Sequence, residues 1–271
     1  MPTKLTFLGV AGYDIEGPER RVLIDPFLST DPPAPYGPDD VPTPDVILVS
    51  HAAFDHLGDT AAIATRTGAP VVCGGDVRAI LMDAGVPSEQ IRATVWGILV
   101  EVNGVIVRPV ACQHWSHGRL RDGTLVTGVP MGFIVETEPG VRIYHYGDTA
   151  IFGDLRLIAE LYRPTVGLLG CTQPHELAAD VPGPGRLLTG EMSPREAALA
   201  AEMLGVDLAV ACHYFDHRQA DVGEFLSLVA EYDTSGRRQA VAPAMGETLV
   251  IDGAGDGTAG IRWRRTGKGG V

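Results

Sequence analysis

The chain has 271 residues, 45% of them hydrophobic, and a formal net charge of −13 at pH 7. This length is sufficient for a large core, so we predict a single domain over residues 1–271. The negative charge is repelled by nucleic-acid phosphates and by anionic membrane surfaces, which argues against both as partners.

The N-terminal residues lead directly into a short apolar strand, without the charged and apolar regions of a signal peptide. No apolar run approaches the ~20 residues that a membrane-spanning helix needs. We therefore expect no membrane span and a cytoplasmic enzyme with a small-molecule substrate, and a homo-oligomer stays open. The four widely spaced cysteines, in or beside apolar runs, are typical of buried thiols.

Short β-rich runs alternate with helical segments, and 34 Gly and 20 Pro residues provide tight turns between them. This alternation predicts an α/β layered fold. The predicted strands lie at residues 4–8, 21–25, 46–50, 70–74, 105–111, 132–137, 141–146, 166–170, 208–212 and 247–251.

Helix signals are clearest in the C-terminal half. A helix is predicted over residues 193–205, because Ser193 provides an N-cap, Pro follows it, and Glu196 completes a capping box. The same capping-box spacing predicts a helix over 221–232, and a further helix is predicted over 154–162.

Three segments read as irregular. Residues 31–44 contain six prolines and are predicted to form a loop, and residues 178–189 are a Gly/Pro-rich loop that could border a pocket. The Gly-rich tail at 253–271 is predicted to be partly flexible.

Side chains of metal-binding type follow several predicted strands. The strand at 46–50 runs into a short loop that offers two imidazoles and a carboxylate, from His51, Asp55 and His56. Strand ends are where ligands converge in α/β folds, because a rigid sheet holds the loops there. Three further strands end near the same residue types: His114 and His117 after 105–111, Asp148 after 141–146, and His213 and Tyr214 after 208–212.

The order His51-x-Ala53-x-Asp55-His56, followed by His114, Asp148 and His213, resembles the metallo-β-lactamase superfamily, whose signature is H-x-H-x-D-H with a distant His, Asp and His. Segments 5–9, 23–27, 144–149 and 192–194 are similar to the branch with ascorbate-6-phosphate lactonase and other metal-dependent hydrolases, and 113–116 resembles N-acyl-phosphatidylethanolamine phospholipase D. The resemblance implies a four-layer αβ/βα sandwich with its cleft at one edge of the sheets.

The resemblance also implies the ligands of one or two divalent ions. His51 and His114 belong to the first metal position, Asp55, His56 and His213 belong to the second, and Asp148 bridges them. Zinc or manganese is expected, and iron stays open.

Ala53 departs from the family pattern, because it stands where the family has a second histidine and a methyl group cannot coordinate a metal. Three explanations stay open: the chain is an engineered variant, another side chain substitutes, or one tightly held ion suffices. His117, His175 and Glu191 are the candidates for substitution, although each is first expected to be a loop or pocket-rim residue.

The implied reaction is hydrolysis, since a divalent ion lowers the pKa of bound water to about 7. Asp55 is expected to ligate or orient the water. His145 is assigned either a direct substrate contact or a hydrogen-bonded place beside the ligands. His117, His175 and Tyr214 are weaker candidates for contact with the substrate or leaving group. A lactone, cyclic amide or related ester is the first choice of substrate. A phosphodiesterase, an iron-dependent oxidoreductase and a protein impaired by Ala53 are the alternatives.

Overall fold

The strands of the protein form two large mixed sheets and one hairpin. The structure is a computed structural model that describes residues 2–31, 33–173, 183–188, 190–252 and 261–266. The strands are β1 (Thr3–Gly9), β2 (Gly12–Glu16), β3 (Arg21–Ile24), β4 (Val46–Leu48), β5 (Val71–Cys73), β6 (Ile91–Ala93), β7 (Val100–Val102), β8 (Val105–Ala111), β9 (Ser116–Arg119), β10 (Leu125–Gly128), β11 (Met131–Glu138), β12 (Val141–His145), β13 (Val166–Gly170), β14 (Leu208–Cys212), β15 (Gln239–Val241), β16 (Thr248–Asp252) and β17 (Arg262–Thr266).

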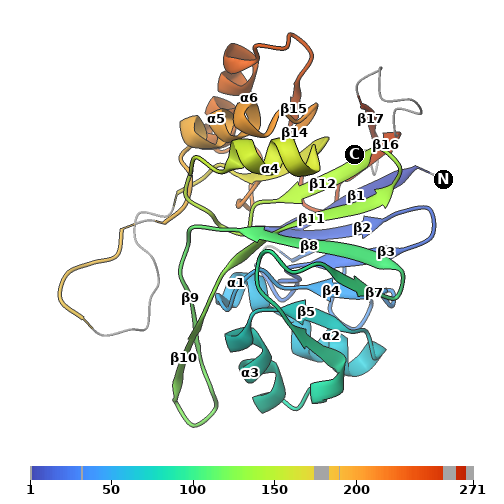
Figure 1. Ribbon diagram of the computed structural model, residues 1–271, viewed down its shortest axis with the longest axis vertical. Coiled ribbons are helices and arrows are strands. Elements are labelled where there is room, and N and C mark those ends of the chain that lie inside the picture. Colours follow the sequence, from blue (N-terminus) through green and yellow to red (C-terminus); the bar gives the residue numbers. More distant parts are fainter. Residues whose placement is uncertain (1, 32, 174–182, 189, 253–260, 267–271) are drawn as a thin grey trace.

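The two sheets divide the chain roughly into its ends and its middle. The first sheet has the order β17-β16-β1-β2-β3-β4-β5-β6, and the second has the order β15-β14-β13-β12-β11-β8-β7. Strands β12, β13, β14 and β15 run parallel to one another, as do β3, β4, β5 and β6. Hairpin β9–β10 projects from the second sheet's side of the molecule (Figure 1).

Helices cover the outer faces of both sheets (Figure 1). The helices are α1 (Phe54–Leu57), α2 (Thr60–Thr67), α3 (Gly75–Asp83), the 3-10 turn η1 (Ser88–Gln90), α4 (Leu155–Tyr162), α5 (Pro194–Leu204) and α6 (Ala220–Tyr232). Ile63 of α2 and Val77 of α3 pack with Ile47 and Val71 of the first sheet. Helices α4, α5 and α6 lie on the second sheet (Figure 1). The predicted αβ/βα sandwich is confirmed.

The space between the sheets is filled by large apolar side chains. Phe7 and Tyr13 of the first sheet and Phe133 and Tyr144 of the second are all fully buried in one core cluster. Burying a side chain of this size contributes roughly 1.5–3 kcal/mol. This packing makes the two sheets rigid, and the rigid sheets fix the positions of the loops at their edges.

Helix signals in the sequence were correct for α5 and imprecise for α6. The hydroxyl of Ser193 accepts from the Glu196 amide, and the Glu196 carboxylate accepts from the Ser193 amide at 2.8 Å, so the predicted capping box is present. In α6 the N-cap is Gln219 and Asp221 lies within the first turn, so the second predicted capping box is wrong. An acidic residue is favoured in either place, because the helix dipole attracts it.

Part of the tail predicted to be flexible is a strand. Residues 262–266 form β17, which pairs with β16, and Trp263 packs against the core while its indole nitrogen donates to Gln239 Oε1 at 2.7 Å. Residues 253–260 and 267–271 lie outside the described residues, as does half of the loop predicted at 178–189. The described part of 31–44 has no helix or strand, as predicted.

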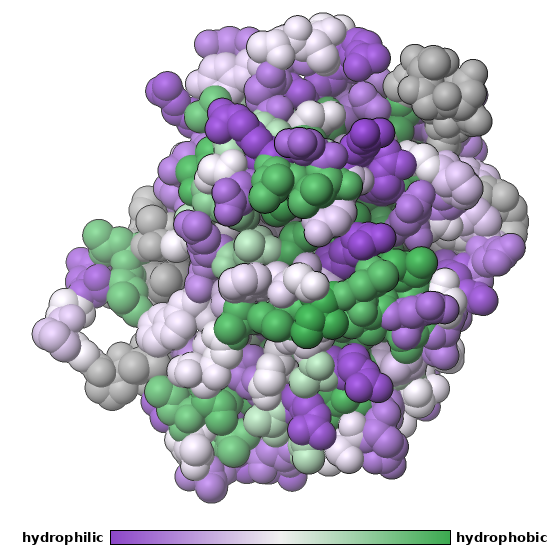
Figure 2. Space-filling model, in the orientation of Figure 1, coloured by the Kyte–Doolittle hydropathy of each residue, from purple (hydrophilic) through white to green (hydrophobic). Residues whose placement is uncertain are grey.

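Apolar side chains gather in a band over the β7–β8 part of the second sheet (Figure 2). Ile98 and Leu99 before β7 are each 52% exposed, and Ile106 of β8 is 45% exposed. Apolar atoms make up more than half of an ordinary protein surface, so the band alone indicates no partner. The predicted homo-oligomer stays a prediction. A membrane-spanning helix is absent from the described part of the chain.

Candidate metal centre

The residues predicted as metal ligands lie at strand ends of both sheets. His51 follows β4, Asp148 follows β12 and His213 follows β14. Asp148 and His213 have positive φ angles of 65° and 66°. This conformation costs a non-glycine residue roughly 1–3 kcal/mol and persists where the surrounding structure imposes it, which is typical of functional sites.

Asp55 and His56 lie in helix α1 and not in the loop that we predicted. The helix is only four residues long and has Ala53 as its N-cap, without a side-chain cap bond. A single turn of this kind gives no periodic apolar pattern, so the sequence offered no signal for it.

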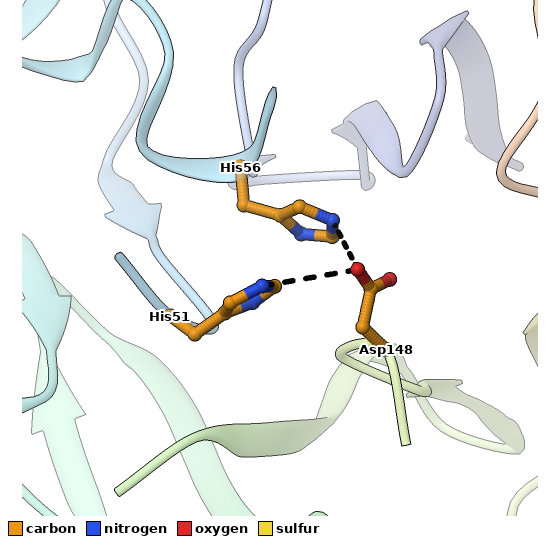
Figure 3. A group of neighbouring side chains, drawn as sticks. All are labelled: His51, His56 and Asp148. Atoms are coloured by element: carbon orange, nitrogen blue, oxygen red, sulfur yellow. Dashed lines mark ion pairs between the residues drawn. The ribbon is translucent and has the colours of Figure 1, made fainter. Parts of the chain in front are cut away.

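The carboxylate of Asp148 lies at the centre of the predicted ligands. Its Oδ2 is 2.9 Å from His56 Nε2, 3.5 Å from His213 Nε2 and 3.8 Å from His51 Nε2. Figure 3 shows the rings of His51, which follows β4, and His56, which lies in α1, reaching the same carboxylate oxygen. Ligands bound tetrahedrally to zinc at 2.0–2.2 Å stand roughly 3.4 Å apart, so these separations suit a shared coordination sphere.

Two further groups of donors overlap with this one. His213 Nε2 is 3.6 Å from Asp55 Oδ2, and His56 completes a group whose ligand atoms all lie within 4.8 Å of one another. The ring of His114 lies edge-on to that of His51, with centroids 4.9 Å apart. The structure thus brings all six predicted ligands to one place, while their role as ligands stays a prediction.

Several ring nitrogens in this cluster have no hydrogen bond within the described residues. They are the Nε2 atoms of His51, His56 and His213, and the first two side chains are buried. Buried polar atoms are nearly always hydrogen bonded. The Asp148 carboxylate lies within ion-pair distance of His56 Nε2 at 2.9 Å, but at 3.5 and 3.8 Å it leaves the nitrogens of His213 and His51 in need of another partner. A divalent cation satisfies all of them, and the donor set therefore fits a metal.

The electrostatics of the cluster separate two kinds of histidine. Burial lowers the pKa of His51 to about 3, and burial also lowers the pKa of His114, so both rings are neutral at pH 7. Burial alone would lower the pKa of His56 and of His213 as well. The neighbouring carboxylates together outweigh it and raise both pKa values: Asp148 and Asp25 act on His56, and Asp148, Asp55 and Glu191 act on His213. Metal binding at these two rings must therefore displace protons.

Asp25 supports His56 from behind, and sequence reasoning missed this role. Its carboxylate is fully buried, lies 2.8 Å from His56 Nδ1, and accepts from the amide and hydroxyl of Ser50 at 2.8 and 2.7 Å. A carboxylate on one ring nitrogen fixes the tautomer and turns the other nitrogen toward the metal. The sequence did contain one signal for this role, because Asp25 is a carboxylate at the end of the predicted strand 21–25.

Tyr146 holds Asp148 from the other side. Its fully buried hydroxyl donates to Asp148 Oδ1, and its ring occupies the space beside Gly170, where an added Cβ would lie 2.3–2.5 Å from the ring. Only glycine at this position of β13 leaves room for the tyrosine.

We expect Gly170→Ala to destabilise the protein by about 1–3 kcal/mol, because the methyl group overpacks the Tyr146 ring. Urea denaturation of the metal-free protein measures this loss. Gly223→Ala is the matched control, since Gly223 lies in α6 with open space around it and alanine favours helix. Equal stability of the two variants would contradict the packing argument.

Glu191 lies closer to the centre than we predicted. Its side chain is 6% exposed, its Oε2 is 3.0 Å from His213 Nδ1, and it forms a third candidate metal-binding group with His114 and Asp148. We expected Glu191 first as a loop or pocket-rim residue and only second as a metal ligand. It does lie in the loop before α5, which turns the side chain into the cluster, and its role as a ligand stays a prediction.

His145 is not among the described residues that line the pocket beside Asp55 and His213. Its ring is fully buried, with Nε2 2.9 Å from the carbonyl oxygen of Ala11 and 3.8 Å from Asp25 Oδ2. The side chain thus points from the second sheet toward the first. Of the two roles that we considered for His145, the geometry favours the hydrogen-bonded place behind the ligands over a direct substrate contact, and its role stays a prediction.

The other predicted residues that the structure describes, His117 and Tyr214, belong to none of the groups of candidate ligands. His117 is in β9 and packs edge-on against Trp115, with ring centroids 4.2 Å apart. Tyr214 is buried and its hydroxyl donates to the Pro243 carbonyl at 2.9 Å, so only its ring can face a substrate. His175 lies outside the described residues.

A pocket opens beside the second group of donors. It has a volume of about 460 Å³, and Asp55 and His213 contribute to its wall. Phe27, Phe54 and Phe215 supply aromatic surface, and the rings of Phe27 and Phe54 meet edge-on at 5.7 Å. A volume of this order suits a small molecule.

Two facing sheets with helices outside, and imidazoles and carboxylates at their shared edge, define a metal-dependent enzyme of the αβ/βα class. Residues 20–214 match the beta-lactamase superfamily domain. Metal-dependent hydrolases of Rubrobacter xylanophilus and Pyrococcus furiosus are each 40% identical to the chain, over 78% of it and 81% of the first relative, and over 84% of it and 92% of the second.

A solved metallo hydrolase from the hyperthermophilic archaeon Ignicoccus hospitalis superimposes with a TM-score of 0.69 at 25% identity, over 93% of this chain and 99% of that one. The chain therefore belongs to the metallo-β-lactamase superfamily, and it is a metal-dependent hydrolase. The resemblance drawn from the sequence is confirmed.

Proposed function

We propose that the protein hydrolyses a neutral small molecule with a lactone, cyclic amide or related ester bond. The observation that carries this proposal is the aromatic pocket beside Asp55 and His213. Apolar walls with a few polar groups at one end are typical of sites for uncharged ligands. The polar end here is the candidate metal centre itself.

The charge of the pocket favours a neutral substrate over a phosphodiester. Its described lining includes the carboxylates of Asp55 and Asp221 and contains no Lys or Arg. Phosphate groups are normally held by cationic side chains or by helix N-termini, because their charge must be compensated. Besides the metal, the N-terminus of α6 is the one group in the described lining that could compensate a phosphodiester, and Asp221 places a carboxylate at that same helix end.

The chain's own residues divide the work of hydrolysis. A bound divalent ion supplies a water of lowered pKa and polarises the scissile carbonyl. Asp55, whose pKa is lowered to about 2 although burial opposes this, stays ionised near neutral pH and can ligate the ion or orient the water. The nearby imidazole of His213, whose Nε2 lies 3.6 Å from Asp55 Oδ2, is the main cause that lowers it. The aromatic wall positions the substrate and limits access of bulk water.

The metal that we propose is zinc or manganese, because imidazole and carboxylate donors suit both. Elemental analysis and an absorption spectrum of the purified protein test this. Zinc or manganese without visible absorption is the expected result. Iron with an absorbing centre would overturn the proposal in favour of the oxidoreductase alternative.

The substrate class is tested by turnover of the metal-loaded protein. We expect kcat/KM for simple γ- and δ-lactones and for aryl esters to exceed that for bis(p-nitrophenyl) phosphate. Faster turnover of the phosphodiester would overturn the proposed class.

Phe54 provides a prediction about the aromatic wall. It is 67% exposed and in reach of a ligand, so Phe54→Ala should raise KM about tenfold and leave kcat nearly unchanged. Phe54→Leu keeps an apolar contact and should show a smaller effect. Leu157→Ala, at an exposed position of α4 outside the pocket lining, is the control. A fall in kcat without a change in KM would count against the pocket.

A further inference from the structure

Ala53 leaves the candidate metal centre one donor short of the family pattern. We infer that Glu191 supplies the missing donor and that its carboxylate, with His114 and Asp148, completes a metal position beside His51. The inference deepens the proposed function and rests on it, because it names the residue that makes the centre complete for two ions.

The first argument is the place of the carboxylate. The ligand atoms of His114, Asp148 and Glu191 all lie within 4.8 Å of one another, and the last two side chains are 2% and 6% exposed. The ring of His114 in turn lies beside that of His51, whose buried Nε2 makes no hydrogen bond among the described residues. A cation held by this carboxylate would therefore lie next to a nitrogen that needs a partner.

The second argument is the rigidity of the segment that carries Glu191. Two residues later the capping box of Ser193 and Glu196 begins α5, and the side-chain amide of Gln173 donates to the Glu191 carbonyl at 2.8 Å. The preceding carbonyl, that of Gly190, lies 3.3 Å from His114 Nδ1. One segment thus brings the carboxylate into the cluster and contacts His114, which leaves the other ring nitrogen for a metal.

The third argument is chemical equivalence. Carboxylate oxygen and imidazole nitrogen both bind zinc at about 2.0–2.2 Å, so Glu can replace His without changing the size of the site. The alanine at position 53 is then part of a rearranged donor set and not a lesion.

A competing assignment comes from His213. Its Nδ1 is 3.0 Å from Glu191 Oε2, so the carboxylate could instead orient that ring, as Asp25 does for His56. In that case Glu191 supports the second metal position, which also contains Asp55. The two assignments predict different results when Glu191 and Asp55 are changed together.

The experiment counts bound zinc. Metal-free protein is titrated with Zn²⁺ against a chromophoric chelator, and bound metal is measured by elemental analysis after gel filtration. We expect wild type to bind two equivalents, and Glu191→Gln and Asp55→Asn to bind one each. The double variant Asp55→Asn/Glu191→Gln should bind none, because the two changes remove different positions. Circular dichroism of each metal-free variant verifies the fold.

A rescue variant and a control complete the test. Adding Ala53→His to Glu191→Gln should restore the second equivalent, and Ala53→His alone should leave the count at two. Glu224→Gln, at an exposed position of α6, should bind as wild type does. A double variant that keeps one equivalent, or a wild type that binds only one, overturns the inference. Correct zinc counts without lactone or ester hydrolysis would overturn only the proposed substrate class.

Discussion

Asp148→Asn is expected to lose metal from both positions at once. The Asp148 carboxylate faces His51, His56 and His213 at 2.9–3.8 Å, so it is the group that the two sets of donors share. Removing a residue that only supports a ligand commonly weakens metal binding or activity by roughly 10–100-fold, so losing the central carboxylate should weaken zinc binding at least about 100-fold. Hydrolysis should fall with it.

Zinc-dependent stabilisation measures this effect without any substrate. A ligand that binds only the folded state raises its stability in proportion to the logarithm of its concentration over Kd, so zinc should raise the Tm of wild type but not of Asp148→Asn. Asp154→Asn is the matched control, since Asp154 is the exposed N-cap of α4 and makes no side-chain cap bond. Unchanged zinc stabilisation of Asp148→Asn would contradict a metal centre built around Asp148.

Several ligands could be placed from the sequence because they directly follow strands, and these strands are recognisable as short runs of apolar residues. Asp148 and His213 come after β12 and β14, which both pair in parallel with β13, so their carboxyl ends share one sheet edge. The loop of His114 is fixed to the same edge, because the Gln113 amide donates to Thr149 Oγ1 at 2.8 Å. Residue type and strand order were therefore sufficient to predict where these side chains lie. The family pattern then indicated that they belong to one metal centre.

Other features depend on pairing that no local pattern shows. Strand β2 carries a nearly buried aspartate, Asp14, which argues against a strand until Arg21 of β3 is placed 2.6 Å from its carboxylate. Glu191 reaches the cluster only through the packing of the segment before α5. Burial and long-range contacts decided both cases, and neither leaves a periodic signal in the sequence.

Asp25→Ala is expected to destabilise the metal-free protein by about 3–5 kcal/mol at pH 7. The buried carboxylate is an ion-pair partner of His56, and it accepts two hydrogen bonds from Ser50. Its pKa is lowered even though burial opposes this, because His56 and His145 outweigh the burial. Breaking a buried pair by removing one partner costs this amount because the other partner stays buried without compensation. Urea denaturation measures the loss.

Two variants separate this effect from a general loss of charge. Asp25→Asn keeps an acceptor for Ser50 while removing the charge, so its stability should fall between wild type and Asp25→Ala. Asp252→Ala removes an aspartate whose ion pair with Arg264 is largely exposed, and should cost less than about 1 kcal/mol. If Asp25→Ala cost no more than Asp252→Ala, His56 would not depend on the buried carboxylate. The tautomer that turns its Nε2 toward Asp148 would then need another cause.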